Sequence, residues 1–286
     1  MQGTVDGFSY GLVTPLVAYL MACLGGALGL RCTTRSMLVA HSWRPGWLAL
    51  GSAAIGSGIW TMHFIAMMGF SVQQTPIQYD KPITFASLGV AILMVGIGIF
   101  IVGYKGASGT ALFTGGTITG LGIASMHYLG MAGMRLNGKL EYNTFTVAAS
   151  VVIAVAAATA ALWAAGQVRG FLWSVGASLV MGLAVSGMHY TGMAALNVHL
   201  HGTTNVTSGD SPAALLAPML IGPLAFLFLA GVVVMFDPLM VMSKPGSPAQ
   251  QKPGIPAHMV RHTGRRPTSR PRRRPDRPGS RTPQRW

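Results

Sequence analysis

The sequence reads MHFIAM at residues 62–67, MHYLGM at 126–131 and MHYTGM at 188–193, and each time this phrase closes an apolar stretch. We call these three segments the Met-His phrases. Their histidines are 64 and then 62 residues apart, about the length of a helical hairpin with its loops. The phrases therefore mark one position in each unit of an internal repeat. Packing alone does not require a histidine at such a position.

The order of residues within each phrase has a geometric meaning if the segment is helical. The histidine and the second methionine are four residues apart and share one face, while the first methionine flanks the histidine. Ala66, Gly130 and Gly192 precede the second methionine, where a small side chain leaves room for a neighbouring helix or a ligand. Each phrase thus pairs an imidazole with thioethers beside open space.

The composition is that of a membrane protein. Hydrophobic residues make up 51% of the chain and charged residues only 9%, whereas soluble domains carry about 25% charged residues. An all-α, polytopic membrane bundle of seven transmembrane helices, built on an internal helical-hairpin repeat, is predicted. The apolar runs that are long enough to cross a bilayer lie at about 10–30, 47–69, 83–104, 110–133, 145–166, 171–195 and 213–241.

The distribution of charge predicts the orientation of this bundle, because Lys and Arg accumulate in short cytoplasmic loops. The segments after the first, third and fifth helices carry cations and no acid: Arg31, Arg35, Arg44, Lys105 and Arg169. The other segments mix the two signs: Lys81, Arg135 and Lys139 with Asp6, Asp80, Glu141 and Asp210. We therefore expect an N-terminus outside, a cytoplasmic C-terminus and all three Met-His phrases at the outer ends of their helices.

A change in composition at about Ser243 divides the chain into a membrane domain at 1–243 and a disordered tail at 244–286, rich in Arg and Pro. The tail holds twelve of the twenty Lys and Arg residues, so it accounts for most of the net charge of +14. Its cations favour contact with anionic lipid. A nucleic-acid partner is not expected, because no aromatic residues are interleaved with the cations.

The chemistry of the phrases indicates copper, since thioethers together with imidazoles select this metal, and Cu(I) in particular, over hard cations. No phosphate-binding loop, nucleophile elbow or pair of carboxylates is apparent in the sequence, so we expect no catalytic residues and no enzyme. The expected metal ligands are Met62, His63, Met67, Met126, His127, Met131, Met188, His189 and Met193.

The triple phrase resembles the MHYT integral membrane sensor domain of bacteria, over about residues 10–241. This resemblance implies an inner-membrane sensor that binds copper through the methionines and histidines and responds to oxygen, carbon monoxide, nitric oxide, or copper and its redox state. It also implies a signal that passes to a cytoplasmic output module. The motif's aromatic residue falls on Phe64, Tyr128 and Tyr190. Of these, Tyr128 and Tyr190 are expected at the bound cofactor, and Phe64 departs from the motif because it lacks a hydroxyl.

Where many relatives carry an output enzyme, only a basic tail of about forty residues follows the last apolar run of this sequence. We therefore expect a stand-alone form that signals through a separate cytoplasmic output protein; a homodimer is compatible with the sequence. Two other functions stay open. A copper permease would need polar or thioether groups through the whole bundle, and a haem-bearing electron carrier would use His and Met as axial ligands.

Overall fold

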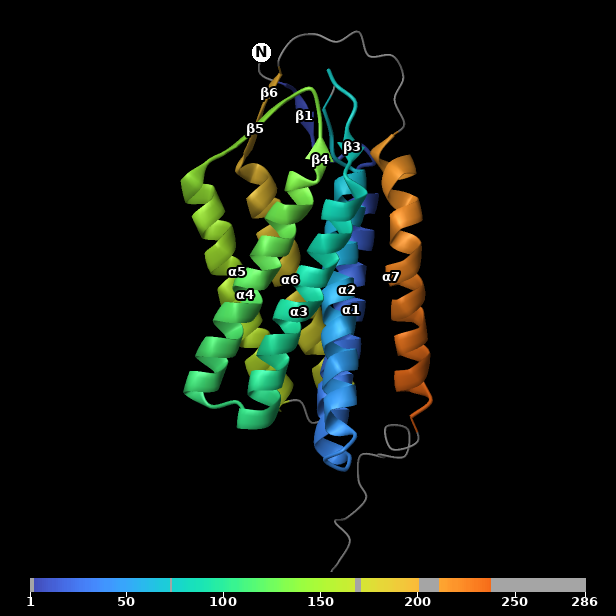
Figure 1. Ribbon diagram of the computed structural model, residues 1–286, viewed down its shortest axis with the longest axis vertical. Coiled ribbons are helices and arrows are strands. Elements are labelled where there is room, and N and C mark those ends of the chain that lie inside the picture. Colours follow the sequence, from blue (N-terminus) through green and yellow to red (C-terminus); the bar gives the residue numbers. More distant parts are fainter. Residues whose placement is uncertain (1–2, 73, 168–170, 201–210, 238–286) are drawn as a thin grey trace, which may run out of the picture. The chain divides into compact units, whose positions relative to one another are not determined.

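The computed structural model describes residues 3–72, 74–167, 171–200 and 211–237. This part of the chain contains seven long helices joined by short segments (Figure 1). The helices run over Val13–Leu38 (α1), Arg44–Met68 (α2), Lys81–Lys105 (α3), Gly109–Ala132 (α4), Thr144–Gln167 (α5), Phe171–Ala194 (α6) and Pro212–Met235 (α7). The prediction of a helical bundle is confirmed, and each predicted run overlaps one helix.

Three antiparallel two-stranded ribbons lie at one end of the bundle, above α2, α4 and α6 in Figure 1. Each ribbon joins the strand before an odd-numbered helix to the strand after the next helix: β1 with β2, β3 with β4 and β5 with β6. The repeating unit is therefore β-α-α-β. The strands are Val5–Asp6 (β1), Ser71–Val72 (β2), Gln78–Tyr79 (β3), Met134–Arg135 (β4), Gly138–Tyr142 (β5) and Leu196–Leu200 (β6).

The three helical hairpins form a closed ring. Each of the helices α1 to α6 packs against the next one in the sequence, and α6 packs back against α1. Helix α7 lies outside this ring, against α2 and α1. The second helix of each hairpin returns to the ribbon end, so α2, α4 and α6 all run toward it, and their C-terminal turns meet there (Figure 1).

Small residues allow the helices of the ring to approach closely. A Cβ atom added to Gly25 of α1 would lie 2.7 Å from the Cα atom of Gly58 of α2. Gly120 lies in the same way against the backbone of Val155, and Gly182 lies against Cys23, so glycines pack the α4–α5 and α6–α1 seams as well. Larger side chains at these positions would push the hairpins apart.

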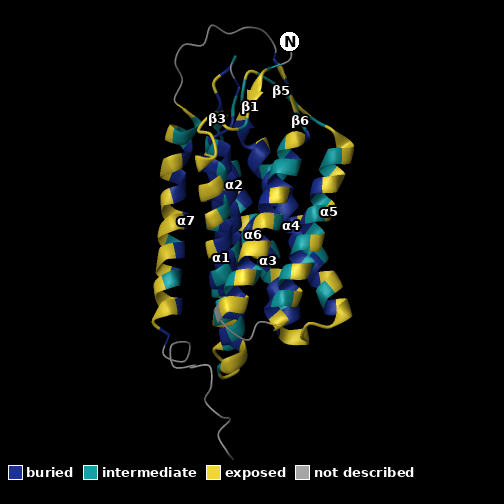
Figure 2. Ribbon diagram, turned by 180° about the vertical axis from the view of Figure 1, so that it is seen from behind, coloured by how far each residue is buried: buried dark blue, intermediate teal, exposed yellow. Residues whose placement is uncertain are grey.

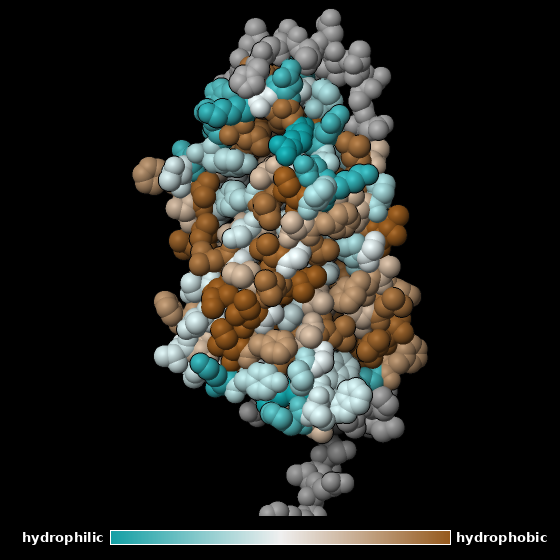
Figure 3. Space-filling view, viewed as in Figure 1, coloured by the Kyte–Doolittle hydropathy of each residue, from teal (hydrophilic) through white to brown (hydrophobic). Residues whose placement is uncertain are grey.

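The outer surface of the ring suits a bilayer. Exposed residues lie mainly on the outside of the helices (Figure 2), and a band of apolar side chains separates two polar ends (Figure 3). By length and hydropathy, six of the helices in the described residues can span a membrane. Helix α4 is as long as they are but richer in Gly and Thr, and it completes the ring between α3 and α5.

The structure corrects two boundaries. Arg31 and Arg35 were expected in the segment after the first helix, but α1 continues through both and ends at Leu38. The reason is that Arg35 has a buried partner: its guanidinium pairs with the carboxylate of Asp237, just after α7, and lies 5.5 Å from the ring centre of Trp47. The last helix ends at Met235 rather than at 241. The predicted tail, 244–286, lies outside the described residues.

The Arg35–Asp237 pair connects the end of α7 to α1, and breaking it should weaken the bundle. Arg35→Met removes the guanidinium that pairs with a buried carboxylate, a change that typically costs about 3–5 kcal/mol. We expect a clearly lower melting temperature in detergent. Lys105→Met is the control, because Lys105 is an exposed cation at the same end. Equal melting temperatures for the two variants would contradict a stabilising role of the pair.

Candidate metal centre

The three histidines of the Met-His phrases meet at the centre of the ring. His63 of α2, His127 of α4 and His189 of α6 direct their Nδ1 atoms toward one another. The Nδ1–Nδ1 distances are 3.0 Å between His63 and His189, 3.2 Å between His63 and His127, and 3.3 Å between His127 and His189. Within the residues that the structure describes, these three form the single cluster with the spacing of metal ligands.

The imidazoles are arranged like the blades of a propeller. Neighbouring rings stand nearly perpendicular, with interplanar angles of 80°, 77° and 88° and ring centres 4.9, 5.0 and 5.2 Å apart. Each ring relates to the next in the same way, so the repeat in sequence has become an approximate threefold symmetry in space.

The small residue of each phrase accommodates the neighbouring histidine. A Cβ atom on Gly130 would lie 2.7 Å from Nε2 of His63, and one on Gly192 would lie 2.5 Å from Nε2 of His127. Of the two uses predicted for this space, contact with a neighbouring helix is the one observed. Both Nε2 atoms are buried and have no hydrogen-bond partner among the described residues. The outer nitrogens are thus held against backbone, and the Nδ1 atoms face one another.

Hydrogen bonding alone cannot satisfy this triangle of nitrogens. A neutral imidazole nitrogen is either a donor or an acceptor, never both. Among three Nδ1 atoms, at least one pair must therefore join two donors or two acceptors. Three lone pairs directed at one cation remove the conflict.

The distances also fit a metal ion. Three nitrogens bound at about 2.0 Å to a tetrahedral ion lie about 3.3 Å apart. The observed 3.0–3.3 Å comes close to that spacing without any movement of the helices. Neutral imidazole suits copper, zinc, iron and nickel, so the histidines alone do not select one metal.

The cluster is closed to solvent. Each of the three histidines is only 1% exposed. His63 lies five residues before the end of α2, about 7.5 Å below it along the helix. Buried side chains of the ribbons and their connections cover this end of the ring: Val72, Ile77, Met134, Val198 and Leu200. We call these covering residues the cap.

The cap is tied to the helices by polar contacts. Asp80 caps α3: the backbone N–H of Ile83 donates to its carboxylate over 3.2 Å, and Arg135 of β4 donates to the other oxygen over 3.2 Å. The backbone hydrogen bond, and then the guanidinium, hold the pKa of Asp80 below its usual value. The carboxylate is therefore ionised throughout the neutral range.

The methionines of the phrases lie mostly in the buried core. Met62, Met126 and Met188 are at most 1% exposed, as are Met67 and Met131. Met193 is half-buried. The structure thus brings the imidazoles together at hydrogen-bonding distance and buries most of the thioethers on the same three helices. A role for these methionines as ligands stays a prediction.

The aromatic residue of each phrase packs edge-on against its own histidine. The ring centres of Phe64, Tyr128 and Tyr190 lie 4.6, 4.8 and 4.9 Å from the neighbouring imidazoles. The hydroxyl of Tyr128 is bonded to Ser150 Oγ of α5 at 2.7 Å, and the ring of Tyr190 stacks on Phe8. Their predicted contact with a cofactor is untested.

The sequence did not reveal that Trp60 and Phe8 support the site; Trp60, three residues before His63, was expected at a membrane interface instead. Trp60 is fully buried, donates from Nε1 to Ser87 Oγ over 3.0 Å, and packs against Phe64. Its position four residues before Phe64, on the same helix face, was a signal that could have found it. Phe8 gave no such signal, because it precedes the first helix and reaches the site only through the ribbons.

Comparison with known proteins gives the same repeat. The family model MHYT, described as a bacterial signalling protein N-terminal repeat, matches residues 56–115, 120–178 and 182–241. No solved structure matches this chain.

Three curated relatives are bacterial signalling proteins. The bifunctional diguanylate cyclase/cyclic di-GMP phosphodiesterase MucR of Pseudomonas aeruginosa is 38% identical over 65% of this chain and 28% of its own length. The cyclic di-GMP phosphodiesterase NbdA of the same organism is 33% identical over 78% of this chain and 30% of its own. The signalling protein YkoW of Bacillus subtilis is 31% identical over 67% and 24%.

The chain spans less than a third of the length of these relatives. The family model nevertheless covers more than half of this chain, with one Met-His phrase in each matched segment, and the helices are those of a multi-pass membrane protein. The chain therefore belongs to the MHYT family of bacterial membrane signalling proteins.

Proposed function

We propose that this protein is an integral membrane sensor in which His63, His127 and His189 hold one copper ion through their Nδ1 atoms. The signal is a diatomic gas (oxygen, carbon monoxide or nitric oxide) or the redox state or supply of copper itself. The observation that carries this proposal is the buried Nδ1 triangle of 3.0–3.3 Å, which suits a cation and leaves hydrogen bonds unsatisfied without one.

Copper is favoured over zinc because of the methionines. When bound, the ion would supply a soft centre that changes oxidation state and binds small gases. The nearby Met residues offer thioethers, which prefer Cu(I). The protein's own part is to fix the imidazoles through Gly130 and Gly192 and to keep water away through the cap.

A copper permease is disfavoured by the interior below the histidines. A permease needs ligands or water along its path. The ring interior beneath the cluster is lined by Ile, Val, Leu, Ala and Met, with Thr33 and Thr119 as the polar exceptions, and it carries no charged side chain. A cation crossing this region would lose its hydration without replacement.

A haem carrier is disfavoured by the geometry of the cluster. Two axial ligands bind opposite faces of a haem, so they need a gap wide enough for the macrocycle between them. Here the Nδ1 atoms of all three imidazoles are within 3.3 Å of one another. One small ion fits between them, and a porphyrin does not.

The signal would leave through α7. This helix packs against α2, which carries His63, and its end is held to α1 by the Arg35–Asp237 pair. A change in the position of α2 would therefore shift the point at which the chain leaves the bundle. We infer that a cytoplasmic output protein reads this shift and that the MHYT chain itself performs no catalysis.

The proposed orientation places the ribbon end outside the inner membrane. Around the ribbons the described residues carry Lys81, Arg135 and Lys139 balanced by Asp6, Asp80 and Glu141. The opposite end carries Arg31, Arg35, Arg44 and Lys105 with Asp237. The excess of cations at that end supports a cytoplasmic location.

The metal proposal predicts one copper ion per chain in protein purified after expression with copper. His127→Ala removes one of three imidazole ligands, so copper content should fall by at least about tenfold after dialysis against a chelator. His199→Ala is the matched control, since His199 is an exposed histidine on β6 that pairs with Glu141. Metal analysis of both variants, and of one lacking all three clustered histidines, gives the result. Undiminished copper in the triple variant would refute the site.

The packing of the outer nitrogens predicts that Gly192→Ala disturbs the triangle without removing a ligand. The added methyl group would lie 2.5 Å from His127 Nε2 and must displace that ring. Gly187→Ala on the same helix meets nothing within 4 Å and makes an equal gain in helix propensity. We expect copper affinity to fall for Gly192→Ala alone. Equal titration curves for the two variants would show that the ring positions do not matter.

The proposed orientation predicts opposite locations for two reporter fusions. A reporter fused after Ser243 should be active in the cytoplasm, and one inserted next to Asp80 should be active outside, because the cation-rich end faces inward. Alkaline phosphatase and green fluorescent protein report the two sides. An external C-terminal fusion would place the histidine cluster near the cytoplasm and rule out a sensor of external signals.

A further inference from the structure

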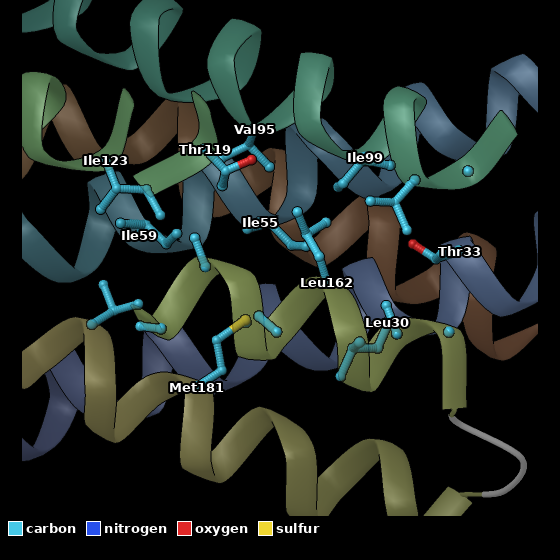
Figure 4. Close-up of a pocket in the computed structure, with 18 of the residues that line it drawn as sticks. Leu30, Thr33, Ile55, Ile59, Val95, Ile99, Thr119, Ile123, Leu162 and Met181 are labelled. Atoms are coloured by element: carbon cyan, nitrogen blue, oxygen red, sulfur yellow. The ribbon is translucent and has the colours of Figure 1, made fainter. Parts of the chain in front are cut away.

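A cavity lined by residues of helices α1 to α6 runs along the axis of the ring (Figure 4). Ile59, Ile123 and Val185 line it, and each lies four residues before one of the clustered histidines on the same helix face. One turn further down, Ile55, Thr119 and Met181 repeat the pattern. The cavity is therefore the lumen of the six-helix ring, closed at one end by the histidine cluster.

The lumen is long and open at one end. On α3 its lining extends from Val95 to Gly103, which corresponds to about 12 Å along the helix. The space of about 680 Å³ between its lining atoms includes their interstices and the open mouth, so it is an upper limit for the volume of any occupant. Met37 and Gly166 line it in the last turns of α1 and α5, and both are exposed. The lumen thus opens at the end opposite the histidines.

The lining is almost entirely apolar. Thr33 donates its hydroxyl to the carbonyl of Gly29, and the buried hydroxyl of Thr119, which lies against Gly98 of α3, has no hydrogen-bond partner among the described residues. The remaining lining side chains are aliphatic, methionine or absent. Apolar cavities stay dry. A dry bore that is open at one end can take up an apolar chain, and hydrocarbon is the apolar material that a bilayer supplies at high concentration.

We propose that the lumen binds the chain of a fatty acid, with its methyl end below the histidines and its carboxylate at the mouth. A single chain matches a bore about 12 Å deep that is entered end-on. A phospholipid has two acyl chains. With one chain in the bore, the second would have to pass between the helices of the ring. The mouth adjoins the cation-rich end of the bundle, where Lys105 is exposed two residues after Gly103, and this charge suits a carboxylate. This inference does not depend on the metal.

Two substitutions on α5 separate the lumen from the lipid-facing surface. Ala158 lines the lumen and is 4% exposed, whereas Ala160 is exposed on the outside of the same helix. Ala158→Phe places a ring in the bore, and Ala160→Phe adds the same ring outside. If the Ala158→Phe protein fails to fold, Ala161→Leu, a smaller change at another lining position, replaces it as the lumen variant.

The test uses the full chain extracted into polymer-bounded native membrane discs, so that no detergent enters the lumen. Discs are irradiated with decanoate, whose ten carbons match the depth of the bore, carrying a diazirine near its methyl end, and the labelled residues are identified by mass spectrometry. We expect adducts on the tier of Ile59, Ile123 and Val185, competition by excess decanoate, and at least about tenfold less labelling in the lumen variant. The Ala160→Phe protein should label as the wild type does, and copper content should be unchanged in all variants.

Three results would overturn the proposal. Adducts confined to lipid-facing residues would mean that the chain does not enter the ring. Labelling of the lumen by a two-chain phospholipid probe, with equal efficiency, would remove the case for a fatty acid. Equal labelling of the Ala158→Phe and Ala160→Phe proteins would show that the lumen is not the site.

Discussion

The structure depends on one constraint: three imidazoles must meet, buried, at the axis of a helical ring. Burying polar groups without adequate partners is costly, and a triangle of Nδ1 atoms cannot satisfy itself by hydrogen bonds. The surrounding features serve this meeting. Gly130 and Gly192 make space for the rings, the aromatic residues hold them edge-on, and the ribbons exclude water. A fold under no such constraint would place apolar side chains at these three positions.

The three histidines are brought together because the first and last strands of each repeat unit pair with each other. Because the strand before each hairpin pairs with the strand after it, every unit begins and ends at the same end of the bundle. The second helix of each unit then carries its histidine at a fixed depth below that ribbon. The family model divides the chain differently, with segments that begin inside α2 and near the middle of α4 and α6. Strand pairing, rather than sequence similarity, identifies the unit that folds around the site.

Much of this was predictable, because it rests on local patterns. Hydropathy located every helix, and the spacing of the Met-His phrases predicted that their histidines lie at one depth. The long-range features left no local trace. Arg35 lies in α1 and pairs with Asp237, which is 202 residues away in the sequence. No local pattern around Arg35 points to that partner. The lumen was invisible as well, since its lining residues are ordinary aliphatic side chains that become a cavity only when six helices close the ring.

The histidine cluster and the lumen share the same three helices, which has a consequence for signalling. A shift of α2, α4 or α6 that changes the Nδ1 triangle also changes the tier of Ile59, Ile123 and Val185 one turn below. If both proposed sites are occupied, a helix shift that changes the affinity of one would couple it to the other, and by linkage this coupling of affinities would be mutual. Helix α7 contacts the ring mainly at α2 and α1, so of the three histidine-bearing helices it follows α2. In the proposed sensor, the asymmetric seventh helix would thus give a nearly threefold centre a single output direction.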